Sequence, residues 1–126
     1  MIDSLSDDLD LNINLERVYV TGFSNGAFMA YSLACNLSEK IAAVAPVSGS
    51  MDIGSIATCQ SVHPMPVMHI HGENDGSISP DGSDYHEPIE DVINFWKDFN
   101  SCEQTDISYG NDNNCLLYTS PSPRDG

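Results

Sequence analysis

Two residues of this 126-residue chain have the types and settings that nucleophilic catalysis requires. Ser24 lies at the centre of the stretch GFSNG, residues 22–26, which matches the pattern G-x-S-x-G. Asp75 closes the stretch HGEND, residues 71–75. A serine hydroxyl attacks a carbonyl carbon when a histidine takes its proton and a carboxylate orients that histidine. The two residues therefore predict acyl transfer, with Ser24 as the nucleophile and Asp75 as the acid of a catalytic triad.

The surroundings of Ser24 are typical of a nucleophile elbow, which is a sharp turn from a strand into a helix. A short apolar segment precedes the motif, and a run of helix-forming residues follows it. On such a turn the serine is strained, and its neighbours Gly22 and Gly26 lack side chains that would collide. The backbone N–H of Asn25 would supply half of an oxyanion hole. The alternative is an ordinary serine in a loop bounded by glycines.

Asp75 has the position expected of the triad acid, because it follows both a predicted strand and Ser24 in chain order. The alternative role is an Asx turn, in which the carboxylate caps its own loop beside Gly76. Asp81 and Asp84 are competitors for the acid, but both lie deeper in the loop and further from the strand end.

Four histidines compete for the role of general base. His69 and His71 alternate on a predicted strand and so share one face, which favours packed or hydrogen-bonded side chains over a metal pair. His63 precedes a proline in a loop, and we expect a structural role for it. His86 satisfies the order serine, aspartate, histidine, but no strand or helix separates it from Asp75. We therefore expect that the chain does not contain the catalytic histidine.

The elements that would position these residues alternate between strand and helix. This order predicts an α/β fold, in which crossover helices connect the strands of a parallel sheet. Ser24, Ser48 and Asp75 each follow a predicted strand, and ligands of such sheets bind at the carboxyl ends of the strands. We predict strands over residues 17–21, 41–47 and 65–70, helices over 27–37 and 88–99, the end of a helix within 2–11, and loops over 48–64 and 72–87.

Composition excludes several classes of partner. The chain has 4 Lys and Arg against 19 Asp and Glu, which gives a net charge of −15. Nucleic acids and anionic membranes require clustered cations, so neither is expected as a partner. No apolar run is long enough to span a membrane, and residues 1–8 do not resemble a signal peptide. The cysteines are widely spaced and form no C-x-x-C pair, so we expect no metal and no cofactor. Oligomeric state is not indicated.

The end of the chain, residues 115–126, differs from everything before it. Its sequence CLLYTSPSPRDG has no helical or strand period and contains two Ser-Pro steps. It resembles the reading-frame translation of a transposon-type sequencing adapter. We therefore expect one domain over residues 1–114 and no domain over residues 115–126.

Several stretches taken together resemble the polyhydroxybutyrate depolymerase/feruloyl esterase-like family of α/β-hydrolases, over about residues 1–104. They are RVYVTGFSNGAFMAYSLAC, IAAVAPVSG, PVMHIHGENDGSISP and INFWKDFNSC. The resemblance implies that Ser24 is the nucleophile, that Asp75 is the triad acid, and that the substrate is a carboxylic ester. It also implies a secreted enzyme without a metal. Cys35, Cys59 and Cys102 fall where such enzymes often carry disulfide cysteines, and their pairing is left open.

The chain also departs from that family. Upstream strands, including the loop that gives the second oxyanion N–H, have no counterpart, and neither does the segment that carries the catalytic histidine. We expect a partial α/β-hydrolase fold, truncated at both ends, that is inactive by itself. Two alternatives are a prolyl-oligopeptidase-like serine peptidase and a non-catalytic relative that binds a polymer or carbohydrate. The intact motif around Ser24 argues against the second, because a binding module does not need a strained serine.

Overall fold

The computed structural model describes Ser4 and residues 12–102, 106–109 and 115–120. The helix predicted within residues 2–11 lies outside the described residues. The strands are β1 (Tyr19–Phe23), β2 (Ala43–Val47), β3 (Val67–Gly72), β4 (Asp106–Tyr109) and β5 (Cys115–Ser120). The helices are α2 (Asn25–Asn36), α3 (Ser55–Thr58) and α4 (Ile89–Phe99), with a short 3-10 helix η1 (Ser38–Lys40).

The strands form one sheet in the order β1-β2-β3-β5-β4. The first three are parallel, with Thr21 opposite Ala45 and Val44 opposite Val67. Helix α2 makes the crossover from β1 to β2, and α3 lies in the connection from β2 to β3. Three parallel strands with crossover helices confirm the predicted α/β fold class.

Strand β5 differs from the sequence prediction, which gave residues 115–120 no secondary structure. The structure pairs β5 antiparallel with both β3 and β4. The segment CLLYTS contains residues with a high preference for strands, and an open sheet edge presents unpaired N–H and C=O groups to any such segment. The similarity of residues 115–126 to an adapter translation, and the domain boundary at residue 114, stay predictions.

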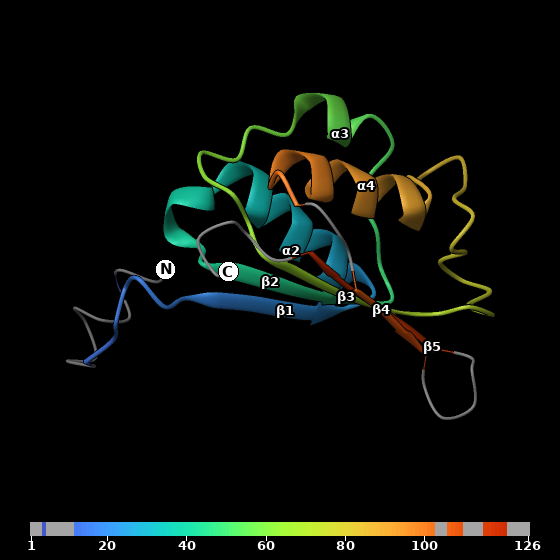
Figure 1. Ribbon diagram of the computed structural model, residues 1–126, viewed down its shortest axis with the longest axis horizontal. Coiled ribbons are helices and arrows are strands. Elements are labelled where there is room, and N and C mark those ends of the chain that lie inside the picture. The colour runs from blue at the N-terminus through green and yellow to red at the C-terminus, as the bar shows by residue number, and fades with distance from the viewer. Residues whose placement is uncertain (1–3, 5–11, 103–105, 110–114, 121–126) are drawn as a thin grey trace.

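The core lies between the sheet and the described helices, which all cover one face of it (Figure 1). Ala27, Ala30 and Ala34 are fully buried along α2, and their small side chains let this helix lie close against β1 and β2. Helix α4 is amphipathic and buries Val92 and Trp96 against the same core. Because α2 is held this closely, its N-terminus has a fixed position at the end of β1.

The other face of the sheet carries large apolar side chains, with Thr21 of β1 between two of them. Tyr19 and Phe23 of β1 and Met68 of β3 are exposed there. They alternate with less exposed neighbours, as the period of a strand requires. Parallel sheets are commonly covered on both faces, so large apolar side chains on the second face agree with the α/β assignment.

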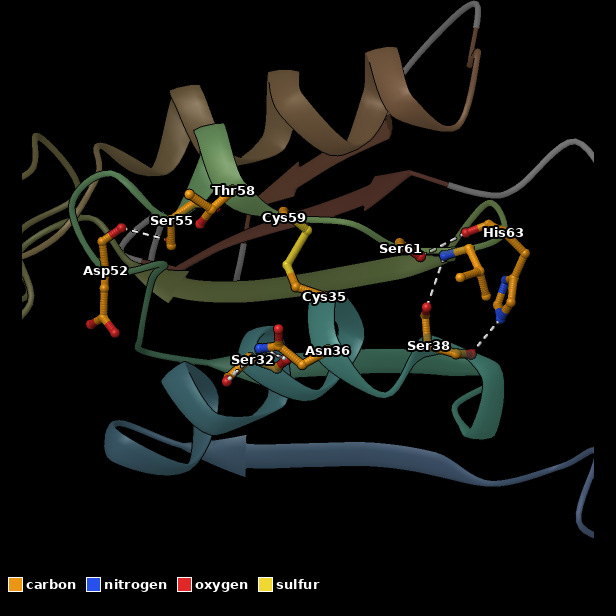
Figure 2. The surroundings of a disulfide bond; sticks show 11 residues. Ser32, Cys35, Asn36, Ser38, Asp52, Ser55, Thr58, Cys59, Ser61 and His63 are labelled. Carbon is orange, nitrogen blue, oxygen red and sulfur yellow. Dashed lines mark hydrogen bonds between the residues drawn. A yellow bond between two sulfur atoms is a disulfide. The ribbon is translucent and has the colours of Figure 1, made fainter.

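A disulfide joins Cys35 in α2 to Cys59, the residue that follows α3 (Figure 2). The two Cα atoms are 4.9 Å apart and the cysteines are separated by 24 positions. The bridge fixes the β2–β3 connection against the carboxyl-terminal part of α2. It settles one pairing that the sequence left open.

Reduction of this disulfide is expected to lower the free energy of unfolding by about 3 kcal/mol, because the closed loop restricts the unfolded chain. Urea denaturation with and without dithiothreitol measures the difference. The double variant Cys35→Ala/Cys59→Ala is the control, since its midpoint should not respond to the reductant. Equal midpoints for the oxidised and reduced wild-type chain would contradict the prediction.

Candidate active site

Ser24 lies on a sharp turn between β1 and α2. Its backbone angles are φ 56° and ψ −109°, and α2 begins at the next residue. Its N–H donates to the Val47 carbonyl oxygen at 2.9 Å, which ties the turn to the end of β2. Non-glycine residues adopt such positive φ values at a cost of about 1–3 kcal/mol. Its hydroxyl does not cap the helix, so Oγ is available at the turn. The geometry is that of the predicted strand-to-helix turn.

The glycines around Ser24 differ in whether a larger residue would fit in their place. A Cβ on Gly22 would stand 2.5 Å from the backbone carbon and oxygen of Gly26. A Cβ on Gly26 would meet no atom within 4 Å, so the predicted need for glycine holds only at the first position. The sequence analysis missed Gly49, whose Cβ would collide with the Ala27 Cβ and stand 2.7 Å from the Ser24 carbonyl oxygen. Only the approach of α2 to the end of β2 reveals this need.

Asn25 is the first residue of α2. The first N–H groups of a helix have no partner within the helix, and the helix dipole makes this end favourable for negative charge. An oxyanion that forms on a carbonyl attacked by Ser24 would face this end. The position of the Asn25 N–H therefore suits the role predicted for it.

Asp75 follows β3 by three residues and is partly exposed. Its Oδ1 accepts hydrogen bonds from the N–H groups of Ser77 and Ile78, both at 2.9 Å. These are the bonds of an Asx turn, which was the alternative to a catalytic role. Its Oδ2 lies 3.7 Å from His71 Nε2 and is not used by the turn. One oxygen thus holds the loop, and the other is left for a partner.

Ser24 and Asp75 are separated by the width of one strand, because β2 lies between β1 and β3. Neighbouring strands are about 4.8 Å apart, so the ends of β1 and β3 are about 10 Å apart. An imidazole with a hydrogen bond at each ring nitrogen spans about 7–8 Å. The ends of the two strands that precede Ser24 and Asp75 are thus further apart than this span, and Asp75 lies three residues beyond the end of β3, a length of chain that can cover the remaining distance.

The chain's own histidines form hydrogen bonds with groups other than the Ser24 hydroxyl. His86 is buried, its Nδ1 bonds the Ser83 hydroxyl and its Nε2 donates to the Ser79 carbonyl oxygen, each at 2.8 Å. His63 donates to the carbonyl oxygens of Ser38 and Pro64, which agrees with the structural role predicted for it. Among the described residues, which include all four histidines, none forms a hydrogen bond with the Ser24 hydroxyl.

His69 and His71 point to the same side of β3, into the core, as their alternation predicted. The His69 Nε2 and the His71 Nδ1 are 3.1 Å apart. Beyond them, the Tyr31 hydroxyl of α2 lies 2.5 Å from His69 Nδ1. Burial lowers the pKa of His69 to about 3, with a further contribution from His71, and burial raises the pKa of Tyr31. Tyr31 and His69 are therefore neutral at physiological pH.

The low pKa of His69 predicts that acid destabilises the fold. The unfolded chain takes up a proton on His69 near pH 6.5, whereas the folded chain does so only near pH 3. Stability should fall as the pH drops through this window, by up to about 1.4 kcal/mol per pH unit from this group. Urea denaturation between pH 4 and pH 7 should show a smaller slope for His69→Gln. Identical slopes would contradict the prediction.

The described part of the chain contains neither a candidate metal site nor a candidate membrane-spanning helix. No group of three His, Cys, Asp or Glu side chains within it is placed to hold a metal ion. Its helices are too short or too polar to cross a bilayer.

Comparison with known proteins agrees with this geometry. Residues 1–106 match the phospholipase/carboxylesterase family. A bifunctional acetylxylan esterase/xylanase of Neocallimastix patriciarum is 31% identical over 87% of this chain and 16% of its own length. Feruloyl esterase C of Emericella nidulans is 32% identical over 84% of this chain and 37% of its own length. Feruloyl esterase D of Neurospora crassa is 35% identical over 63% of this chain and 26% of its own length.

The chain spans between 16% and 37% of the length of these curated relatives. The family match nevertheless covers most of the chain, and it includes both Ser24 and Asp75. The matched region also contains the three parallel strands and the helices that position these two residues. The chain belongs to the phospholipase/carboxylesterase family of α/β-hydrolases.

Proposed function

We propose that the protein is a serine-dependent carboxylic ester hydrolase that works through an acyl-enzyme. The observation that supports this most strongly is Ser24, held at φ 56° directly before α2. Its Oγ attacks the ester carbonyl carbon, and its proton passes to a histidine and then to the departing alcohol. Water next attacks the acyl-enzyme, which releases the acid and returns the serine hydroxyl.

Two further residues support the reaction in this proposal. The N–H of Asn25 donates to the oxygen that becomes negative as Ser24 attacks, at the positive end of α2. The Asp75 Oδ2, which the Asx turn does not use, accepts a hydrogen bond from the catalytic histidine and stabilises its charged form. The Asx turn supports this role, because it fixes the carboxylate through its other oxygen.

We also propose that these 126 residues do not turn over esters unaided. Each of the four histidines bonds groups other than Ser24, and His86 is held on both ring nitrogens within its own loop. Loss of a triad member lowers the rate by about 10⁴-fold or more. The general base is then a histidine that this chain does not contain.

The substrate class is suggested by the relatives, whose names specify feruloyl and acetylxylan esters. We propose a feruloyl or acetyl ester as the substrate, and a polyhydroxybutyrate ester as the alternative that the sequence resemblance suggests. The disulfide between Cys35 and Cys59 supports a secreted enzyme, because such bonds persist in oxidising surroundings.

Imidazole added to the assay tests the proposal, because a free imidazole can enter the space of an absent histidine ring. We expect the chain to hydrolyse a chromogenic short-chain ester only when imidazole is present, at a rate above that of imidazole alone. Ser24→Ala corrects for the imidazole background. Turnover that does not depend on Ser24 would refute the mechanism, and turnover without imidazole would show that a histidine of the chain serves as the base.

A further inference from the structure

A chain of buried polar side chains crosses the core from α2 to the loop of Asp75. It begins at the Tyr31 hydroxyl, continues through the rings of His69 and His71, and ends at the Ile78 carbonyl oxygen. The last bond joins His71 Nε2 to that oxygen at 2.7 Å. Tyr31, His69 and His71 are each at most 1% exposed, so these hydrogen-bonded side chains lie entirely inside the protein.

The Ile78 carbonyl fixes the direction of every bond in the chain. A carbonyl oxygen only accepts, so His71 Nε2 carries the proton and its Nδ1 accepts when the ring is neutral. The proton between the two rings then belongs to His69 Nε2, which leaves His69 Nδ1 as an acceptor. The Tyr31 hydroxyl therefore donates to it. With both rings neutral, one arrangement of protons satisfies all three bonds, and in that arrangement both histidines are in the Nε2–H form.

The far end of the chain lies under the turn that holds the carboxylate. Ile78 takes part twice, because its N–H donates to Asp75 Oδ1 and its carbonyl accepts from His71. The same His71 Nε2 is 3.7 Å from Asp75 Oδ2. The turn thus has one anchor in its own carboxylate and a second in the core.

We propose that Tyr31, His69 and His71 are positioning residues for Asp75, whose turn they hold from the core through the Ile78 carbonyl. The inference rests on the proposed function in one respect, which is the assignment of Asp75 as the triad acid. None of the three residues touches the reacting atoms. They act through the Asp75 turn, and the reaction depends on the direction in which Oδ2 points.

Packing alone does not explain these residues. Buried polar groups cost free energy unless they are hydrogen-bonded, and leucine or phenylalanine on β3 would fill the same space without that cost. Burial also keeps His69 neutral, since its pKa is lowered to about 3. A neutral His69 ring has one donor and one acceptor, so it can accept from Tyr31 at one nitrogen and donate to His71 from the other. What the polar chain adds to the fold is a donor at the Ile78 carbonyl.

Two variants of His71 separate positioning from packing. In His71→Gln the side-chain amide can place an N–H near the original Nε2, whereas His71→Leu fills the space without a donor. Amide hydrogen exchange of the 126-residue chain reports the turn directly through the N–H groups of Ser77 and Ile78. We expect exchange at these two sites to be about 10-fold faster in His71→Leu and near the wild-type rate in His71→Gln.

Equal acceleration of all amides in His71→Leu, those of β1 and α4 included, would overturn the proposal, because it would show only a loss of global stability. Equal effects of the two variants on the turn would also overturn it. Where His71→Leu does not fold, Tyr31→Phe takes its place, since it removes one hydroxyl from the opposite end of the chain. We expect nitrogen chemical shifts to report the Nε2–H form of both histidines in the wild type and a mixture with the Nδ1–H form in Tyr31→Phe. If both histidines keep the Nε2–H form in Tyr31→Phe, the proposed direction of the hydrogen bonds is wrong.

The imidazole assay then links the turn to catalysis. In His71→Leu we expect kcat with imidazole to fall about 10-fold at unchanged KM, and His71→Gln to restore most of it. An unchanged kcat in a variant with a loosened turn would overturn the positioning role. Absence of Ser24-dependent turnover in the wild type would instead refute the proposed function, while hydrogen exchange would still decide whether the core holds the turn.

Discussion

Replacement of Ser24 by alanine is expected to abolish the imidazole-dependent hydrolysis of esters by this chain. Without Oγ no acyl-enzyme forms, and only the background reaction of free imidazole remains. In complete serine hydrolases, loss of the nucleophile typically costs about 10⁴–10⁶ in rate. Initial rates on a chromogenic ester measure the loss. With imidazole present, a fluorophosphonate probe followed by mass spectrometry should find its adduct on Ser24 in the wild-type chain and no adduct in the variant.

Ser48→Ala is the matched control for this experiment. Ser48 also follows a parallel strand and also has a positive φ, 53° against 56° for Ser24. Its N–H donates to the Ile70 carbonyl oxygen, much as that of Ser24 donates to Val47. The two substitutions should therefore perturb the backbone alike. Turnover should survive in Ser48→Ala. Equal losses of turnover in both variants would mean that a disturbed backbone at the strand ends, and not the missing Ser24 hydroxyl, causes the loss.

The parts of the fold that the sequence predicts well are those with a local signal. The runs RVYVT and IAAVAPV are apolar and β-branched, and they become β1 and β2 with a shift of about two residues at their ends. The helix predicted over residues 27–37 begins two residues earlier, at Asn25, because Ser24 occupies the turn itself. Short elements were missed. Helix α3 has only four residues, which is too short to show a helical period.

The missed features of the site depend on contacts between distant segments. Gly49 must be glycine because α2 packs against the end of β2, which no local pattern records. In the sequence, Tyr31 looks like an ordinary core residue of a helix, because its hydrogen-bond partner His69 lies 38 positions later. The pairing of Cys35 with Cys59 likewise depends on where α3 lies. Sequence patterns thus locate the candidate residues, whereas three-dimensional packing decides which neighbours hold them.

The two readings of Asp75 that the sequence set against each other are compatible in the structure. A carboxylate has two oxygens, and the Asx turn uses Oδ1 alone. A histidine held by Oδ2 would gain from that turn, because a carboxylate fixed before the reaction needs no reorganisation during it. The catalytic assignment of Asp75 therefore does not require the local turn to be absent.

Gly22→Ala is expected to lower the free energy of unfolding by about 3 kcal/mol, near the upper end of what overpacking costs. The new Cβ would lie 2.5 Å from the backbone carbon and oxygen of Gly26. These atoms belong to the first turn of α2, so no side-chain rotation relieves the contact, and either β1 or the helix must move. Because Ser24 lies between the two, the same shift should also slow its imidazole-dependent reaction with a fluorophosphonate. Urea denaturation and the labelling rate measure the two effects.

Gly26→Ala is the control that makes this prediction specific. An added Cβ there meets no atom within 4 Å, and alanine favours a helix over glycine by up to about 1 kcal/mol. We therefore expect Gly26→Ala to be as stable as the wild type or slightly more stable, although both glycines belong to the same G-x-S-x-G motif. Equal destabilisation by the two variants would show that the motif needs glycine for backbone freedom at both positions. A wild-type midpoint for Gly22→Ala would show that α2 can move away from β1 at little cost, and the close approach would then not be what holds Ser24 in its turn.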